Sequence, residues 1–313
     1  MTTHPDDALT DLLSLLRREQ YHFVTPTPAT HARVLARADK RQARDLRDLL
    51  GWSLPFVSNE IGAEVEDLLR QAGAIDEAGS GLFKSRLRVS ALHDQLFLHS
   101  AYPTEAEDAV FFGPDSYRFA DLIAAELERD PIRPGAHIVD MGAGAGVGGI
   151  VAGLVSRAAR VTLTDLNPKA LRLARINAAA AGVDVKTIES ETLDQVADPI
   201  DLAVINPPYI IDDANRAYRD GGGMHGGEIP LKMTEMAAAR LAPGGRVILY
   251  TGAAIVNGHN TLCEAIGQMA DTRGLTSTCR ELDPDVFGEE LEKPTYADVE
   301  RIALVAVVIR RSL

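Results

Sequence analysis

The chain has few cysteines and no long apolar run, and each shortage excludes a class of protein. Its two cysteines, Cys263 and Cys279, have no partners at metal-ligand spacing, so we expect reduced thiols and no resident metal. No apolar stretch approaches the roughly 18 residues that a membrane-spanning helix needs. The N-terminus lacks the basic and apolar segments of a signal peptide. These absences predict a cytoplasmic enzyme without a membrane partner.

Basic residues are also scarce relative to acidic ones. The 32 Lys and Arg face 45 Asp and Glu, for a net charge of −13, and after residue 100 the counts are 20 against 31. Negative charge repels phosphate backbones, although a local basic patch is compatible with an acidic total. Nucleic acid is therefore the less favoured partner.

The chain is long enough for one large core and a second small one, since 46% of its 313 residues are apolar. We expect a helical N-terminal domain over residues 1–103 and a larger domain over 104–313. In the first domain, helical periodicity and two short β-rich runs suggest a winged-helix-like fold. The expected helices include Thr30–Ala38, Gln42–Leu50 and Ile61–Gly73, and the expected hairpin pairs Leu82–Val89 with Gln95–His99.

The N-terminal domain has two open interpretations. Lys84, Arg86 and Arg88 alternate along one expected strand, which is compatible with a basic edge for nucleic acid. The same charges also discourage pairing of a strand edge. Acidic residues on the neighbouring helix favour this second view, or a role of the domain in covering the substrate or forming a homodimer, over nucleic-acid binding.

From about residue 104, strands and helices alternate, which predicts an α/β fold with a parallel sheet. Strands are expected at Ala136–Val139, up to Asp165, at Val185–Ile188, Ile200–Ile205, Arg246–Tyr250 and Ile302–Ile309, with helices at Ala120–Leu127, Glu228–Leu241 and Thr261–Thr272. Asp140 ends the first of these strands, and a glycine-rich run follows it. Glycines allow a tight turn and close approach of a ligand, while the next helix offers free N–H groups. Nicotinamide and flavin enzymes use a similar turn, so the loop alone does not identify the cofactor.

A rigid polar tetrapeptide follows the buried run Ile200–Ile205 and reads Asn206, Pro207, Pro208 and Tyr209. An asparagine oxygen and a proline carbonyl can both accept hydrogen bonds from one planar NH2 group, and proline has no competing N–H. The tyrosine ring can lie against a flat acceptor and favour the charge that develops on nitrogen. This tetrapeptide predicts a clamp for an amide or an exocyclic amine.

Together, Asp140 with its glycine loop, the acid at Asp165 and the Asn-Pro-Pro-Tyr tetrapeptide resemble class I S-adenosylmethionine-dependent methyltransferases. Within that family the chain is similar to enzymes that methylate a glutamine side-chain amide in translation release factors, and to their small-domain relatives. The resemblance implies a Rossmann-like seven-stranded sheet and S-adenosyl-L-methionine as cofactor. It also implies that Asp165 holds the ribose hydroxyls, and that Glu191 stands where relatives meet the adenine; a solvated loop glutamate is the alternative.

The resemblance assigns three groups of residues. The implied cofactor-binding residues are Asp140, Gly142, Ala143, Gly144, Gly146, Asp165, Leu166, Glu191 and Asn206. The implied catalytic residues are Asn206, Pro207 and Tyr209, and the implied substrate-binding residues are Asp115, Pro208 and Tyr209. A helix N-cap is the competing explanation for Asp115.

Two loops have open roles. Residues 221–227 contain five glycines and His225, so we expect a mobile loop beside the acceptor. Residues 283–296 form an acidic insertion that either overhangs the active-site edge or is a solvated loop.

The acceptor has three candidate classes. A protein glutamine-type amide is favoured by the resemblance, and a small-molecule amine or amide fits the acidic composition. Adenine N6 of RNA or DNA also fits the clamp, because the same planar NH2 group is presented by a flipped base.

Overall fold

The computed structural model describes residues 4–157, 159–197, 199–212 and 219–313. The chain separates into two compact units. One consists of Met1–Arg118, Gly144–Val147 and Arg172–Asp184, and the other of Phe119–Ala143, Gly148–Leu171 and Val185–Leu313. The predicted boundary at residue 103 stays a prediction.

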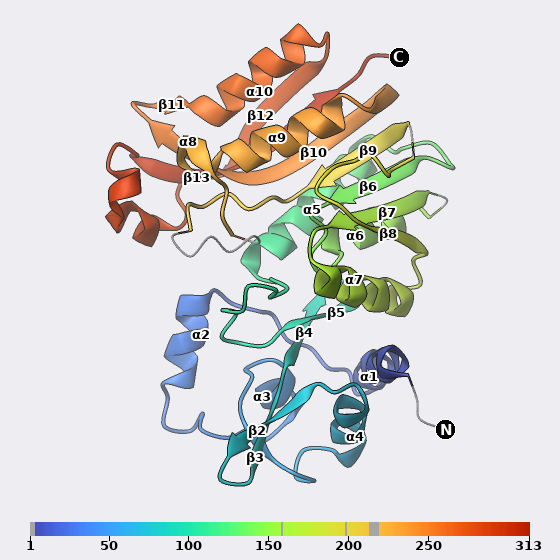
Figure 1. Cartoon of the computed structure of the whole chain (residues 1–313), viewed down its shortest axis with the longest axis vertical. Coiled ribbons are helices and arrows are strands. Elements are labelled where there is room, and N and C mark those ends of the chain that lie inside the picture. Colours follow the sequence, from blue (N-terminus) through green and yellow to red (C-terminus); the bar gives the residue numbers. More distant parts are fainter. Residues whose placement is uncertain (1–3, 158, 198, 213–218) are drawn as a thin grey trace. The chain divides into compact units, whose positions relative to one another are not determined.

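The first unit combines short helices with two small antiparallel sheets (Figure 1). Its helices are α1 (Pro5–Arg18), α2 (Pro28–Leu35), α3 (Leu46–Leu50) and α4 (Ala63–Gln71). One sheet has the order β1 (Phe56–Val57), β3 (Leu82–Ser85), β2 (Ile75–Gly79), and β4 (Leu87–Leu92) pairs with β5 (Gln95–Ser100). The likeness to a winged helix stays a prediction.

The expected hairpin of Leu82–Val89 with Gln95–His99 is only partly right. The strand breaks after Ser85, whose hydroxyl accepts a hydrogen bond from the Leu87 amide at 3.0 Å and donates one to the Leu87 carbonyl at 2.8 Å. A serine that bonds the backbone two residues away offers it an alternative to a continuous ladder. As a result β4 pairs with β5, whereas β3 pairs with β1 and β2.

The alternating basic residues do not form a free basic edge. Lys84 donates to the Tyr102 carbonyl at 2.8 Å, and Arg86 pairs with Asp76. Arg88 is buried, at 4% exposure, and donates to the backbone of the neighbouring strand. Arg88 is buried and Arg86, although exposed, is paired with Asp76, so these three residues do not form a continuous row of free cations for a phosphate backbone.

The second unit contains the predicted α/β sheet (Figure 1). The strand order is β12-β13-β10-β9-β6-β7-β8, and the two-residue β11 pairs with the end of β10. Neighbours from β10 to β8 are parallel, whereas β13 is antiparallel to both β10 and β12. The strands are β6 (His137–Met141), β7 (Arg160–Asp165), β8 (Val185–Glu189), β9 (Ile200–Ile205), β10 (Leu241–Val256), β11 (His259–Asn260), β12 (Thr276–Asp283) and β13 (Arg301–Arg310). The predicted seven-stranded Rossmann-like sheet is therefore confirmed.

Both faces of the central strands are covered. Every residue of β9 is buried, as expected for a parallel strand with both faces covered. On one face, Ala237, Ile266 and Ala270 of two helices pack with Ala203 and Val247 of the strands. From residue 114 onward the helices are α5 (Pro114–Arg129), α6 (Val147–Val155), α7 (Pro168–Ala181), α8 (Gly223–Gly226), α9 (Glu228–Ala238) and α10 (Thr261–Thr272), and the 3-10 turns are η1 (Gly288–Glu292) and η2 (Pro294–Tyr296). Most of α7, from Arg172 onward, belongs to the first unit.

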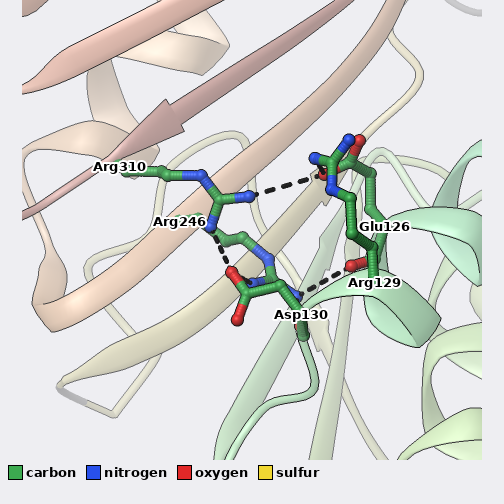
Figure 2. Close-up of polar contacts among 5 residues, drawn as sticks. All are labelled: Glu126, Arg129, Asp130, Arg246 and Arg310. Atoms are coloured by element: carbon green, nitrogen blue, oxygen red, sulfur yellow. Dashed lines mark hydrogen bonds and ion pairs between the residues drawn. The ribbon is translucent and has the colours of Figure 1, made fainter.

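A cluster of ion pairs ties the end of α5 to the starting edge of β10 (Figure 2). Asp130 lies 2.6 Å from Arg246 and 2.5 Å from Arg310, which face each other across β10 and β13. Glu126 accepts from Arg129 and lies 3.5 Å from Arg310. Arg246 is only 3% exposed, and a buried guanidinium is tolerated only when it is paired. The cluster therefore anchors α5 at the sheet edge opposite to the carboxyl ends of the parallel strands.

The prediction of two unpaired cysteines is wrong. Cys263 of α10 and Cys279 of β12 form a disulfide with their Cα atoms 6.1 Å apart. Consecutive elements that pack side by side bring the two residues within disulfide range. Their separation of 16 residues does not by itself indicate such packing.

Among the helices of the described ranges, none combines the length and the apolar character that crossing a bilayer requires. The same ranges contain no group of three or more His, Cys, Asp or Glu side chains placed to hold a metal ion.

Candidate active site

Three neighbouring strands end at the same level of the sheet. Met141 of β6 pairs with Thr164 of β7 on one side and with Ile205 of β9 on the other. Asp165 and Asn206 are the next residues along those two strands, so both lie at one carboxyl edge. In open α/β sheets, ligands bind outside this edge.

Asp140 is buried beneath the turn that follows β6. Its carboxylate accepts a hydrogen bond from the Gly149 amide at 2.7 Å. Burial raises the pKa of Asp140 to about 7, while the Gly149 hydrogen bond lowers it and the nearby charge of Asp165 raises it. A Cβ atom at Gly148 would lie 3.0 Å from both Asp140 carboxyl oxygens, and one at Gly149 would lie 2.3 Å from Leu163. The helix can approach Asp140 only because both positions are glycine.

The turn after β6 leaves room for a ligand. Gly142 and Ala143 both donate to the Thr164 carbonyl, at 2.9 and 3.0 Å. Gly142 has a φ of +67° and is exposed, and a Cβ atom there would meet only Met233 within 4 Å, at 3.4 Å. A positive φ with open space beside it suits close approach of a cofactor to the backbone.

The end of β7 presents a carboxylate beside an apolar side chain. Asp165 accepts from the Asn167 amide at 2.8 Å. Leu166 is one of the few large apolar residues on the surface, with 56% exposure. A carboxylate can accept from two ribose hydroxyls, and an apolar side chain next to it can lie on a flat base. An acceptor carboxylate beside an exposed apolar side chain fits a nucleoside.

Glu191 lies beyond β8 with its side chain in solvent. Its side chain is 64% exposed, and one carboxyl oxygen lies 3.2 Å from the Lys232 amine. An exposed ion pair of this kind contributes little to stability. The contact with adenine stays a prediction, and the arrangement also fits the alternative of a solvated loop glutamate.

The tetrapeptide after β9 has an uncommitted amide next to buried rings. Asn206 is half-buried, and among the described residues its side chain forms no hydrogen bond. Pro207 is buried, and Pro208 is half-buried. A side-chain amide without an intramolecular partner is available to a ligand, with its oxygen as acceptor and its NH2 group as donor. The arrangement can accept a planar NH2 group.

Tyr209 rests on glycines that leave space for its ring and its backbone. A Cβ atom at Gly252 would lie 2.3 Å from the Tyr209 ring, and Cβ atoms at Gly221 and Gly226 would lie 2.7 and 2.3 Å from its backbone. Gly221 and Gly226 are both buried. These two glycines therefore pack closely against the clamp, and the expected mobility of residues 221–227 stays a prediction.

The insertion at 283–296 packs on the chain that follows the clamp. Phe287 meets the Tyr209 ring with centroids 5.9 Å apart, and Tyr296 accepts from the Ile211 amide at 2.8 Å. Tyr296 and Glu290 are 1% and 3% exposed. The alternative of a solvated loop is therefore wrong for Tyr296 and Glu290. The acidic composition of the segment did not reveal that Phe287 and Tyr296 anchor it.

Gly144, Gly146 and Asp115 belong to the first unit, and their predicted roles stay predictions. Both glycines have positive φ, at +53° and +84°. Asp115 lies in the first turn of α5 and is 3.8 Å from Arg118. Because α5 begins at Pro114, Asp115 is inside the helix and is not its N-cap.

Sequence reasoning missed four contributors to this edge, namely Gly148, Gly149, Gly252 and Phe287. Gly252 had a signal, since a glycine inside a β-rich run often marks close approach of another group. The paired glycines at 148 and 149 carried the same signal for a helix start. Phe287 had none, because its partner Tyr209 is far away in the chain.

The known proteins that this chain resembles in sequence are methyltransferases. A family model described as methyltransferase small domain matches residues 118–273. The chain is 37% identical over 124 residues to a release factor glutamine methyltransferase of Deinococcus radiodurans, covering 36% of this chain and 44% of that protein. It is 28% identical over 250 residues to the same-named protein of Cereibacter sphaeroides, covering 75% and 87%.

Other similarities extend to enzymes named for RNA. The chain is 32% identical over 117 residues to a ribosomal RNA small subunit methyltransferase C of Pseudomonas aeruginosa, covering 37% of this chain and 32% of that protein. Among solved structures, Trm5b of Pyrococcus abyssi has a TM-score of 0.51 at 16% identity, covering 81% and 68%. That likeness shows the fold alone. The match spans less than half of the Deinococcus relative.

Proposed function

We propose that this class I S-adenosylmethionine-dependent methyltransferase, in which residues 118–273 match the methyltransferase small-domain family, methylates the side-chain amide of a glutamine in a protein. The predicted family and its cofactor, S-adenosyl-L-methionine, are confirmed by that match. The proposed acceptor is a translation release factor, because the relatives from Deinococcus and Cereibacter carry that name. Such an acceptor implies that the enzyme acts in the cytoplasm.

The observation that carries the proposal is the Asn206 amide at the carboxyl edge of the sheet, whose side chain forms no hydrogen bond within the described part of the chain. In the proposed complex, its oxygen and the Pro207 carbonyl accept the two N–H groups of the glutamine amide. These hydrogen bonds hold the nitrogen lone pair out of conjugation with the carbonyl. Tyr209 and Pro208 orient the plane of the amide.

The cofactor residues complete the arrangement. S-adenosyl-L-methionine supplies a methyl group on a sulfonium, which is transferred when the N–C bond forms and the S–C bond breaks. We assign Asp165 to its ribose hydroxyls, Leu166 and Glu191 to its adenine, and the turn at Gly142 and Ala143 to its methionine part. The amide loses one proton to water. Catalysis then comes from proximity and alignment rather than from a nucleophilic side chain.

The test is methyl transfer from labelled S-adenosyl-L-methionine to a purified bacterial release factor, with the modified residue located by mass spectrometry. We expect one methyl group on a glutamine. Asn206→Ala should abolish transfer, while calorimetric binding of the cofactor changes by less than about twofold, because the clamp contacts the acceptor. Strong residual turnover in Asn206→Ala would disprove the clamp.

Two other acceptors are compared in the same assay. Total RNA and DNA serve as acceptors because relatives with ribosomal RNA names exist, and a small-molecule amine pool serves for the acidic surface. The paired state of Lys84, Arg86 and Arg88 favours the protein acceptor over nucleic acid. Label found only in nucleic acid would replace the proposal with adenine N6 methylation. A homodimer through residues 1–103 stays a prediction.

A further inference from the structure

The chain just beyond the clamp is held by side chains of a distant segment. The Ile211 amide donates to the Tyr296 hydroxyl at 2.8 Å, and the Lys293 amine donates to the Ile211 carbonyl at 3.4 Å. Both polar backbone groups of Ile211 therefore end on side chains at or next to η2. Because Ile211 is two residues past Tyr209, this anchor lies next to the acceptor clamp.

A second tie uses a buried carboxylate. Glu290 is 3% exposed, accepts a hydrogen bond from Arg219 and lies 2.5 Å from the Lys293 amine. Arg219 also approaches Asp212, at 3.7 Å. A buried carboxylate is stable only when it is paired, and removing it leaves its partners without their counter-charge. Glu290 thus holds the same Lys293 that binds Ile211.

The start of the same segment reaches the clamp itself. Phe287, which precedes η1, meets the Tyr209 ring with centroids 5.9 Å apart and an interplanar angle of 64°. The ring also lies against Gly252, where a Cβ atom would be 2.3 Å from it. Residues 287–296 therefore contact Tyr209 directly and hold the chain that follows it.

We propose that Tyr296 and Glu290 are positioning residues for methyl transfer, which fix Tyr209 by anchoring Ile211 and Arg219. The proposal rests on the proposed function, because it assigns to this segment the alignment of the acceptor amide. Transfer by proximity is sensitive to position, and a misplacement of about 1 Å can cost roughly 100-fold in rate. Both side chains act through Ile211, Arg219 and Lys293 and not through contact with the acceptor amide.

The experiment compares Tyr296→Phe, Glu290→Gln and the control Glu289→Gln in the full chain. Tyr296→Phe removes only the hydroxyl and keeps the buried ring. Glu289 is the exposed neighbour of Glu290 in η1, so its variant has the same charge change. The measured quantities are kcat and acceptor KM on the release factor, cofactor Kd by calorimetry, and the exchange rate of the Ile211 amide hydrogen.

We expect Tyr296→Phe to lower kcat about five- to tenfold, the equivalent of one lost hydrogen bond, and Glu290→Gln to lower it further. Cofactor Kd should stay within about twofold of wild type, since the cofactor residues lie on other strands. The Ile211 amide should exchange faster in both variants and at the wild-type rate in Glu289→Gln. A structural role alone would change exchange without changing kcat.

Two results would overturn the proposal, namely an unchanged Ile211 exchange rate in Tyr296→Phe, or faster exchange with wild-type kcat. Failure of the proposed function is distinguishable, because it appears in the wild type as absence of methyl glutamine. Amide exchange does not require an acceptor, so it still decides whether the anchor exists. The ratio of variant to wild-type kcat is then taken with whichever of the three acceptor classes accepts label.

Discussion

The amide of Gly149 donates to a carboxyl oxygen of Asp140 at 2.7 Å, which fixes the helix start of α6 against the end of β6. The close approach also brings Gly149 against Leu163, where a Cβ atom would lie at 2.3 Å. This contact joins the buried acid to the turn that carries Gly142 and Ala143. Any side chain at position 149 would push the helix away from the sheet.

Gly149→Ala should therefore lower the free energy of unfolding by about 1–3 kcal/mol, the usual cost of overpacking. In an open helix the same change would raise it, since alanine favours helix by roughly 1 kcal/mol over glycine. Gly267→Ala in α10 is the matched control, because the nearest atom to its Cβ is 4.0 Å away. Urea unfolding measures both variants, and a stabilising Gly149→Ala would contradict the close packing.

The raised pKa of Asp140, at about 7, predicts a pH dependence of stability. Between about pH 4 and pH 7 the folded state keeps the proton that the unfolded state has lost. Stability from this group is therefore present at low pH and is lost as the pH rises through 7. The difference in unfolding free energy between wild type and Asp140→Asn, measured without cofactor, should fall from pH 4 to pH 7. A flat or rising difference would show that Asp140 is ionised throughout.

Asp165→Ala should raise the cofactor Kd by roughly 10- to 100-fold, the value of hydrogen bonds to a charged acceptor. Isothermal calorimetry measures this change directly. Asp271→Ala removes an exposed carboxylate from the end of α10 and should leave the Kd unaltered. Equal losses in both variants would point to net charge rather than to ribose contacts.

Much of the second unit could be predicted because its signals are local. The run Ile200–Ile205 matches β9, and Thr261–Thr272 matches α10. The prolines that follow Ile205 mark the end of a strand. Asn260, which accepts from the Cys263 amide, marks the start of a helix. Both signals can be recognised without reference to the rest of the chain. The glycine turn and the tetrapeptide were found in the same way.

The missed features depend on contacts between residues distant in the chain. The pairing of Phe287 with Tyr209 and of Tyr296 with Ile211 joins segments that only the folded sheet brings together. The same holds for Cys263 and Cys279. The acidic composition of residues 283–296 left a solvated loop as one alternative, yet Tyr296 and Glu290 are buried.

Gly252→Ala tests whether the position of Tyr209 controls transfer. A Cβ atom there would lie 2.3 and 2.6 Å from two atoms of the Tyr209 ring, so the ring must move away from β10. Because the clamp aligns the acceptor, we expect kcat to fall by about 100-fold with cofactor Kd unchanged. The measurement is single-turnover methyl transfer beside calorimetry. If the transfer rate stays at the wild-type value although the ring is displaced, Tyr209 does not orient the acceptor, and the clamp reduces to Asn206 and the Pro207 carbonyl.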